Sequence, residues 1–210
     1  MTVYSGKECG HDGIMRWQMK KSTVRVTIIL ILVIVGLVGL YAVLVSRARS
    51  GEEELTKVQL VLSRNLDWKY PESPKKVIEY YAELERCFYN EECTEQEIED
   101  LGIQARKLYD QELLANNEMT GYLIKLKEDI RGFKDAKRRI SSIAVASASN
   151  VDYFSQDGYD FARIYCGYTV TESNRQTVME GRVYLLRRDA DRHWKIYGWD
   201  SADNVHVGEE

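Results

Sequence analysis

The stretch Tyr159-Asp-Phe-Ala-Arg-Ile-Tyr-Cys-Gly-Tyr-Thr-Val170 decides the fold, because its side chains alternate in character from one residue to the next. One set of alternate positions holds Tyr159, Phe161, Arg163, Tyr165 and Thr169, and the other holds Ala162, Ile164, Cys166, Tyr168 and Val170. A period of two predicts a strand with one face on a core. The Asp157-Gly158 pair just before it is typical of a hairpin turn.

Further strands are predicted on both sides of this stretch. Small side chains around Val145 indicate a strand within residues 141–149. A strand over residues 176–188 follows, with Met179, Val183 and Leu185 on its more apolar face. The last strand covers residues 193–200 and places Trp194 and Ile196 opposite Lys195, Tyr197 and Trp199.

Three helices are predicted ahead of these strands. Ser73 before Pro74 is an N-cap signal, and an apolar stripe at helical spacing then runs to Asn90. Thr94 and Glu97 form a capping-box pattern for a second helix that ends at residues 116–117. The third runs from residue 118 to 139. Helices followed by antiparallel strands predict an α+β domain, with three helices packed on a curved antiparallel sheet.

An uncharged, almost wholly aliphatic run, VTIILILVIVGLVGLYAVLV, covers Val26–Val45. At about 1.5 Å per residue, a helix of this length matches the hydrocarbon core of a bilayer. We therefore predict one N-terminal transmembrane helix whose partner is the lipid bilayer. The expected organisation is a cytoplasmic tail (1–25), the transmembrane helix (26–46), a juxtamembrane linker (47–70), the α+β domain (71–202) and a loose C-terminal tail (203–210).

The charges that flank this run predict its orientation. Five basic residues precede the run, namely Lys7, Arg16, Lys20, Lys21 and Arg25. Positive charge favours the cytoplasmic side, so we expect a single-pass plasma-membrane protein with its N-terminus inside and its C-terminal domain extracytoplasmic. The alternative is a cleaved signal peptide. The run is longer than the core of such a peptide, and Ser46-Arg47-Ala48 is a poor cleavage site, so an uncleaved signal anchor is favoured.

The closing residues Trp194-Lys195-Ile196-Tyr197-Gly198-Trp199, after three helices and long antiparallel strands, resemble the last hairpin of the NTF2-like cone fold. A second resemblance runs through Leu62-x-Arg64-Asn65-Leu66, Tyr70-Pro71-x-Ser73-Pro74, Cys87-Phe88-Tyr89-Asn90 and Ala105-Arg106-x-Leu108-Tyr109-Asp110. Together these motifs resemble an uncharacterised family of single-pass membrane proteins from Gram-positive bacteria. That resemblance implies an extracytoplasmic domain and assigns no activity. The layout is also similar to that of VirB8-like assembly subunits.

Sequence motifs for catalysis are missing. The chain has no phosphate-binding glycine loop, no Gly-x-Ser-x-Gly and no His-Glu-x-x-His, and its three histidines are scattered. We therefore expect no enzyme activity, no cofactor and no metal site. The net charge of −4 argues against a nucleic-acid partner. The expected function is a membrane-anchored binding or assembly module of the cell envelope, with envelope proteins or a second copy as partners.

Two sets of residues are candidates for binding. A cone fold leaves room for a pocket between helices and sheet, and its expected lining is Cys166, Tyr168, Met179 and Trp194. The alternative function, binding or converting a small ligand, would use this pocket. The expected interaction face of the sheet consists of Tyr159, Phe161, Arg163, Tyr165, Arg182, Tyr184, Tyr197 and Trp199, because Tyr, Trp and Arg are favoured at binding hot spots. Ordinary cross-strand packing also accounts for that set.

Cysteines give one further expectation. Cys87 and Cys93 flank a predicted helix end and would come close enough for a disulfide in an oxidising compartment. Whether they form one stays open at this point. Cys166 lies within the long strand, where a buried thiol is the simplest interpretation.

Overall fold

The computed structural model describes residues 21–49 and 55–202 of the chain. The chain divides into two compact units, residues 1–54 and residues 55–210. The first contains the helix α1 (Lys21–Arg49), of which the side chains of residues 29–44 are described. Among the described residues, no helix combines the length and the apolar character that crossing a membrane requires. The transmembrane segment 26–46 therefore stays a prediction, and most of the tail 1–25 and all of the tail 203–210 lie outside the described residues.

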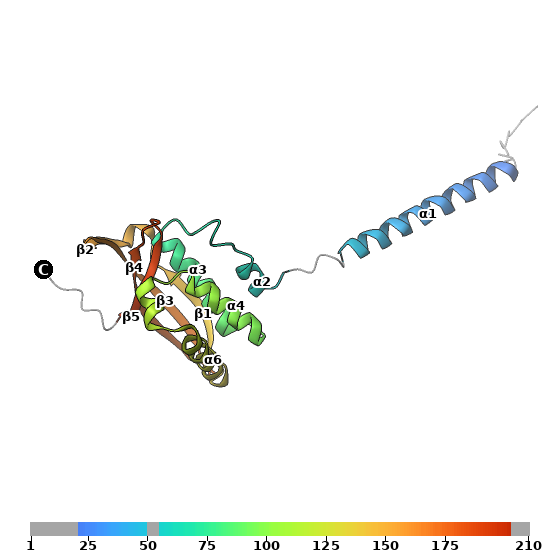
Figure 1. Ribbon diagram of the computed structural model, residues 1–210. Coiled ribbons are helices and arrows are strands. Elements are labelled where there is room, and N and C mark those ends of the chain that lie inside the picture. The colour runs from blue at the N-terminus through green and yellow to red at the C-terminus, as the bar shows by residue number, and fades with distance from the viewer. Residues whose placement is uncertain (1–20, 50–54, 203–210) are drawn as a thin grey trace, which may run out of the picture. The chain divides into compact units, whose positions relative to one another are not determined.

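A five-stranded antiparallel sheet forms one layer of the second unit (Figure 1). Its strands are β1 (Arg139–Val145), β2 (Asp152–Gln156), β3 (Tyr159–Thr171), β4 (Thr177–Arg188) and β5 (Trp194–Ser201), with a short 3₁₀ turn η1 (Ala148–Asn150) between the first two. The order is β1-β3-β4-β5, and β2 pairs with the first half of β3 while β1 pairs with its second half. The predicted hairpin is confirmed, because Asp157 and Gly158 adopt φ angles of 53° and 80° in the turn between β2 and β3.

The strand β3 has the two faces that its sequence predicts. Its alternate positions from Ala162 to Val170 are buried, and the positions between them are partly exposed. β4 forms where it is predicted, and Met179, Val183 and Leu185 share one face, but this is not the face that meets the helices. Tyr184 pairs with Ile164 and lies with it on the helix-facing side, whereas Met179 and Leu185 pair with residues of the opposite face. The helix-facing side of β4 carries two charged residues, Glu180 and Arg182. It is therefore the less apolar side in sequence, and hydropathy alone predicts that the other side faces the core.

Helices cover one face of the sheet (Figure 1). They are α3 (Pro74–Asn90), α4 (Glu95–Arg106), α5 (Gln111–Asn116) and α6 (Met119–Asp135). The second predicted helix is interrupted, because Tyr109 forms a parallel bridge with Ile196 and Asp110 N–H donates to Ile196 O (2.9 Å). Leu108 and Tyr109 are buried against the sheet. They therefore continue the apolar stripe of α4, so the sequence pattern gives no sign that the helix ends before them.

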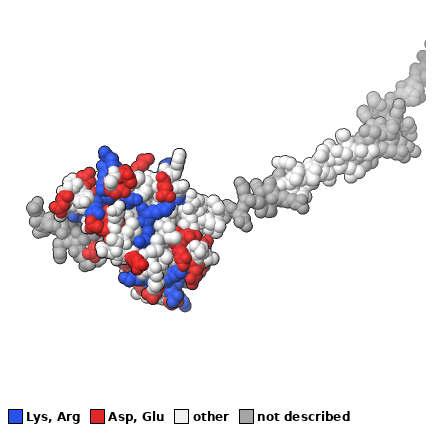
Figure 2. Space-filling view, viewed as in Figure 1, with Lys and Arg blue, Asp and Glu red and all other residues white. Residues whose placement is uncertain are grey.

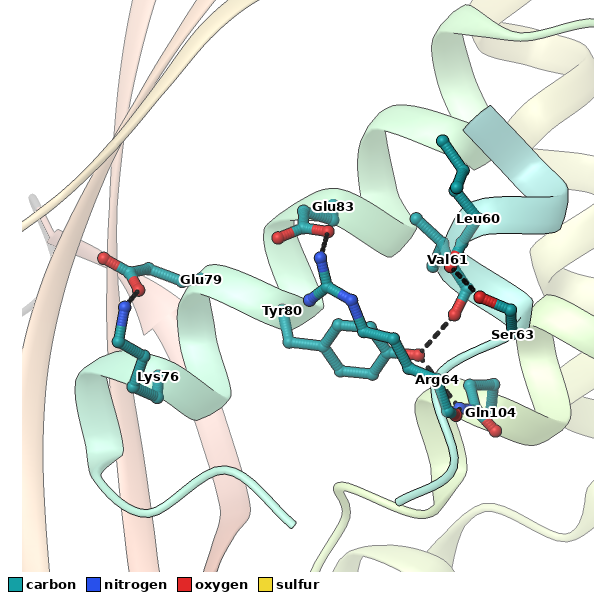
Figure 3. Close-up of polar contacts among 9 residues, drawn as sticks. All are labelled: Leu60, Val61, Ser63, Arg64, Lys76, Glu79, Tyr80, Glu83 and Gln104. Carbon is teal, nitrogen blue, oxygen red and sulfur yellow. Dashed lines mark hydrogen bonds and ion pairs between the residues drawn. The ribbon is translucent and has the colours of Figure 1, made fainter. Parts of the chain in front are cut away.

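Residues 55–70 belong to the folded unit, so the predicted linker 47–70 is wrong over this part. A short helix α2 (Lys57–Leu62) buries Val58 and Val61 in the core. Figure 3 shows how it is held: Tyr80 Oη donates to Val61 O (2.9 Å), and Gln104 Nε2 donates to both Tyr80 Oη (2.9 Å) and Arg64 O (2.7 Å). These bonds fix the chain entry against α3 and α4.

The three described cysteines are thiols. Cys93 Sγ donates a weak hydrogen bond to Cys87 O (3.4 Å) at the end of α3, and Cys166 is buried in β3. Burial raises the pKa of Cys87 to about 11 and that of Cys166 to about 11. These thiols are therefore protonated at neutral pH and act as small apolar side chains.

The capping box at the start of α4 gives a first prediction. Thr94 Oγ1 accepts from Glu97 N–H (3.2 Å), and the Glu97 carboxylate accepts from Thr94 N–H (2.8 Å). Thr94→Ala is expected to lower the free energy of unfolding by about 1 kcal/mol, because it leaves a helix N–H without its acceptor. Chemical denaturation measures this. Ser147→Ala is the control, since Ser147 precedes η1 without a side-chain cap bond. Equal stability of Thr94→Ala and the wild type would contradict the prediction.

Candidate functional site

A buried carboxylate lies at the centre of the interface between α3 and the sheet. Glu85 is 4% exposed and follows Tyr81 by one helical turn, so it faces inward with the apolar stripe of α3. Its Oε1 accepts from Arg182 Nη1 (2.8 Å), and its Oε2 accepts from Tyr168 Oη (2.5 Å). Burial of a charge is costly unless it is paired and hydrogen-bonded, and this arrangement meets both conditions.

Two tyrosines extend the hydrogen-bond chain into the sheet. Tyr168 of β3 and Tyr184 of β4 have their hydroxyl oxygens 2.6 Å apart. Since Tyr168 gives its single proton to Glu85, Tyr184 donates to Tyr168. The Arg182 guanidinium lies over the Tyr168 ring at 4.3 Å from its centroid. Burial raises the pKa of both tyrosines well above the ordinary value, so the chain of donors stays protonated.

Glu85 itself is perturbed. Burial raises its pKa above the ordinary value of 4.5, while Arg182 and the Tyr168 hydroxyl act in the opposite direction. Both carboxylate oxygens already accept hydrogen bonds. The carboxylate therefore holds Arg182 in one orientation rather than presenting a free base to a substrate.

Aromatic rings form the wall beside this pair. Tyr81 and Tyr109 share a hydroxyl–hydroxyl hydrogen bond of 3.0 Å, and the Tyr122 ring meets Tyr109 edge-on at 6.0 Å. Trp199 of β5 packs against Tyr81 and Tyr184 with centroids 6.2 and 6.1 Å apart. Burial raises the pKa of Tyr109 to about 12. The phenols are therefore neutral groups that can both donate and accept.

A pocket of about 370 Å³ opens between this wall and α6. Its lining consists of Tyr81, Glu85, Phe88, Tyr89, Tyr109, Asn117, Tyr122, Lys125, Leu126, Asp129, Arg182 and Trp199. Two further hollows, of about 400 and 430 Å³, adjoin it and are also lined by Arg182. Arg182 thus stands where three hollows meet, with its side chain 31% exposed. Such a concave site, in which half of the lining residues are aromatic and charged and amide groups converge, suits a small ligand.

The raised pKa of Glu85 gives a second prediction. The folded state binds the carboxyl proton more tightly than the unfolded chain does. The stabilisation it brings is complete below the ordinary value of 4.5 and is lost as the pH rises through the raised folded value. The free energy of unfolding of the wild type, relative to Glu85→Gln, is therefore expected to fall as the pH rises from 4.5 towards 7. Urea denaturation at a series of pH values measures it, and a constant difference would contradict it.

The residues predicted to line the pocket are separated in the structure. Tyr168 lines the 400 Å³ hollow, and Cys166 is buried beside it in the core. Met179 is 82% exposed and pairs with Thr169 of the outer face, and it lines the 430 Å³ hollow together with Arg182. Trp194 is buried away from these hollows, where its ring packs on Tyr153 at 5.7 Å.

The predicted interaction face is split between the two sides of the sheet. Tyr159, Phe161, Arg163, Tyr165 and Tyr197 lie on the outer face. Arg182, Tyr184 and Trp199 line the pocket on the helix-facing side or pack in the core there, so they do not share one face with the other five. A β-bulge causes part of this separation: Leu185 pairs with Gly198 and Leu186 with Ile196, which leaves Tyr197 as the extra residue. The bulge places Tyr197 and Trp199 on opposite faces although they are two residues apart.

Charged groups elsewhere show ordinary surface pairing. Glu180 pairs with Arg138 (2.9 Å) and Arg163 with Asp152 (3.3 Å). Figure 2 shows basic and acidic side chains interspersed over the visible face of the second unit. Among the described residues, Asp189, Asp191 and His193 bring possible ligand atoms within 4.8 Å of one another in the β4–β5 turn. Exposed acidic groups in a turn are common without a metal ion, and we assign none here.

Four residues of the site are not predicted from the sequence, namely Glu85, Tyr81, Tyr109 and Tyr122. A signal for Glu85 was present, because a carboxylate at position 85 interrupts the inward stripe between Tyr81 and Phe88. A charge in an apolar stripe indicates a buried partner. Nothing in the sequence identified Arg182 as that partner.

Comparison with known families gives one match. A family model described as "Domain of unknown function (DUF6715)" matches residues 15–199. No curated protein matches the chain. This match confirms that the chain resembles an uncharacterised family, one with no assigned function. The bacterial source and the membrane context stay predictions.

Proposed function

Because the chain belongs to the DUF6715 family, whose description carries no activity, we propose its function from its own geometry. The domain binds a small polar ligand in the pocket between α6 and the sheet, and Arg182 is the main recognition group. This is the alternative that the sequence left open. A pocket of about 370 Å³ with convergent polar groups supports it over a cone filled by its own side chains.

The position of Arg182 carries this proposal. Its guanidinium has five N–H donors in a rigid fork, and one nitrogen, Nη1, is bonded to Glu85. Stacking over Tyr168 and the bond to Glu85 hold the fork in place before any ligand arrives. Preorganisation of this kind lowers the entropy lost on binding. A second side-chain hydrogen bond joins Arg182 to Tyr184, and the residue, whose side chain is 31% exposed, lines all three hollows.

The proposal includes the placement of the domain. The uncharged run Val26–Val45, with basic residues before it, supports a signal anchor that tethers the domain outside the plasma membrane. Helices on one face of a curved antiparallel sheet also support the NTF2-like resemblance. Protease treatment of intact cells tests the orientation, since residues 55–202 are expected to be cleaved while a tag at the N-terminus is protected. Protection of both ends would overturn it.

Blocking the pocket mouth tests ligand binding. Lys125 is an exposed residue of α6 at this mouth, so Lys125→Trp is expected to fill the pocket without removing a core contact. Ile124→Trp is the matched control, because Ile124 is the next residue of the same helix, 54% exposed, and lines none of the three hollows.

The measurement uses the full chain in detergent with fluorinated tryptophan. A panel of amino acids, nucleosides, saccharides and carboxylic acids is titrated while the ¹⁹F signal of Trp199 is followed. At least one class is expected to shift this signal saturably in the wild type and in Ile124→Trp, and to bind at least tenfold more weakly in Lys125→Trp. No saturable shift, or equal affinity in Lys125→Trp, would overturn the proposal.

A second candidate function, the assembly module, rests on the outer face of the sheet. Tyr159 is 50% exposed there, and the Arg187 guanidinium lies between the Tyr159 and Tyr197 rings at 4.8 Å from each centroid. Tyrosine is enriched at binding hot spots, and Arg187 holds the two tyrosine rings in place. A photo-crosslinker at position 159 in intact cells is expected to trap an envelope protein or a second copy of the chain. A crosslinker at the exposed position 103 of α4 is the control, and equal products from both positions would count against this face.

A further inference from the structure

Trp199 is a half-exposed aromatic residue that is nevertheless held in place. Its side chain lines the pocket, and the residue is 43% exposed. The rings of Tyr81, Tyr109 and Tyr184 surround it, with centroids 6.2, 5.9 and 6.1 Å away. A large ring fixed by its neighbours offers an apolar platform that loses little conformational entropy when a ligand packs on it.

The charges of the pocket balance. Lys125 and Arg182 face Glu85 and Asp129 among the lining residues. An anionic ligand on Arg182 would compete with Glu85, whose buried carboxylate cannot be left unpaired without a large cost. A cationic ligand on the acidic side would lie close to the same guanidinium. The pocket therefore favours a ligand without net charge.

The polar groups of the pocket are complementary to a ligand that both donates and accepts hydrogen bonds. Arg182 and Lys125 only donate, Asp129 only accepts, and the phenol of Tyr89 does both. A hydroxyl group can satisfy each of them. A ligand with many hydroxyls around a ring that also has an apolar face would pack on Trp199 and meet these groups at its edge.

Resting on the proposed function, we propose that the ligand is a neutral saccharide, with one sugar ring on Trp199 and its hydroxyls bonded to Arg182 and Asp129. The two adjoining hollows share Arg182 with the pocket, and one of them also shares Trp199. They continue the concave surface beyond the pocket at Arg182. The site thus fits an internal unit of a longer, uncharged glycan rather than a free monosaccharide alone.

Three trimers of matched length test the ligand class. The full chain in detergent is titrated by calorimetry with N-acetylglucosamine trimer, which is neutral, glucosamine trimer, which is cationic, and galacturonate trimer, which is anionic. The neutral trimer is expected to bind at least tenfold more tightly than either charged one. Tighter binding of a charged trimer would overturn the assignment.

Variants locate the site. Trp199→Ala is expected to weaken binding of the neutral trimer at least tenfold, and Trp199→Phe, which keeps a ring, to weaken it less. Trp68→Ala is the control, since Trp68 is 89% exposed and lines none of the three hollows. Equal affinity in Trp199→Phe and Trp199→Ala would show that a ring at position 199 does not contribute to binding of the trimer.

The two proposals fail differently. If no trimer binds while another class in the panel shifts the Trp199 signal, the saccharide assignment is wrong and ligand binding in the pocket stands. If neither the trimers nor the panel bind, both proposals are wrong.

Discussion

Replacing Arg182 with alanine is expected to lower the free energy of unfolding by about 3–5 kcal/mol. The change leaves the Glu85 carboxylate, whose side chain is 6% exposed, without its cation in the interior. The remaining hydrogen bond from Tyr168 is not enough to replace a paired charge. The expected loss of stability is large because Arg182 is removed while Glu85 stays buried. It is therefore larger than the net contribution of the ion pair to the free energy of unfolding.

Chemical denaturation of three variants separates these effects. Arg163→Ala is the matched control: Arg163 lies on the neighbouring strand β3, points to the outer face and pairs with an exposed Asp152. It is expected to cost at most about 1 kcal/mol. Combining Arg182→Ala with Glu85→Gln is expected to restore part of the lost stability, because no unpaired charge then remains. Similar losses in Arg182→Ala and Arg163→Ala, or no recovery in the double variant, would contradict the buried-pair explanation.

The same pair connects stability with the proposed function. Glu85 neutralises Arg182 and fixes its direction, and it thereby lowers the affinity of the site for anions while leaving N–H donors for neutral groups. A site that lacked Glu85 would expose a bare guanidinium, which prefers carboxylates and phosphates. We therefore expect Glu85→Gln to shift the preference of the pocket towards anionic ligands.

The parts of the fold that the sequence predicts well are those set by local rules. Alternation in β3 follows from its position in the middle of the sheet with one face on the helices. Asp157 and Gly158 tolerate the positive φ angles of a tight hairpin. Ser73 and Pro74 mark the start of α3 at the residue where the structure begins it. Each of these signals depends on neighbours within a few residues.

The parts that failed depend on contacts far apart in the sequence. The helix-facing side of β4 carries Arg182 because Glu85, 97 residues away, supplies its partner. The break between α4 and α5 arises from the bridge of Tyr109 to Ile196. No local sequence pattern contains these pairings. Because the candidate site is built from them, most of it could not be predicted from the sequence.

Asp110 gives the second large expected effect, because four interactions converge on it. Its backbone N–H donates to Ile196 O of β5 (2.9 Å), and its side chain caps α5 by accepting from Glu112 N–H (2.9 Å). The same carboxylate, 5% exposed, accepts two hydrogen bonds from Arg187, at Nε (3.0 Å) and Nη2 (2.5 Å). Asp110 therefore fastens the helix layer to β4 and β5 at the edge of the pocket wall.

Asp110→Ala is expected to lower the free energy of unfolding by about 2–4 kcal/mol, since it removes two hydrogen bonds from the Arg187 guanidinium, 12% exposed, which keeps only its pair with Glu112 (2.6 Å), and it also removes a helix cap. Asp67→Ala is the control, because Asp67 pairs with Lys107 at 2.8 Å with its side chain 77% exposed, and it is expected to cost at most about 1 kcal/mol. A double-mutant cycle with Arg187→Ala isolates the pair. A coupling energy near zero would mean that the backbone bridge at Ile196, rather than the ion pair, fastens the two layers.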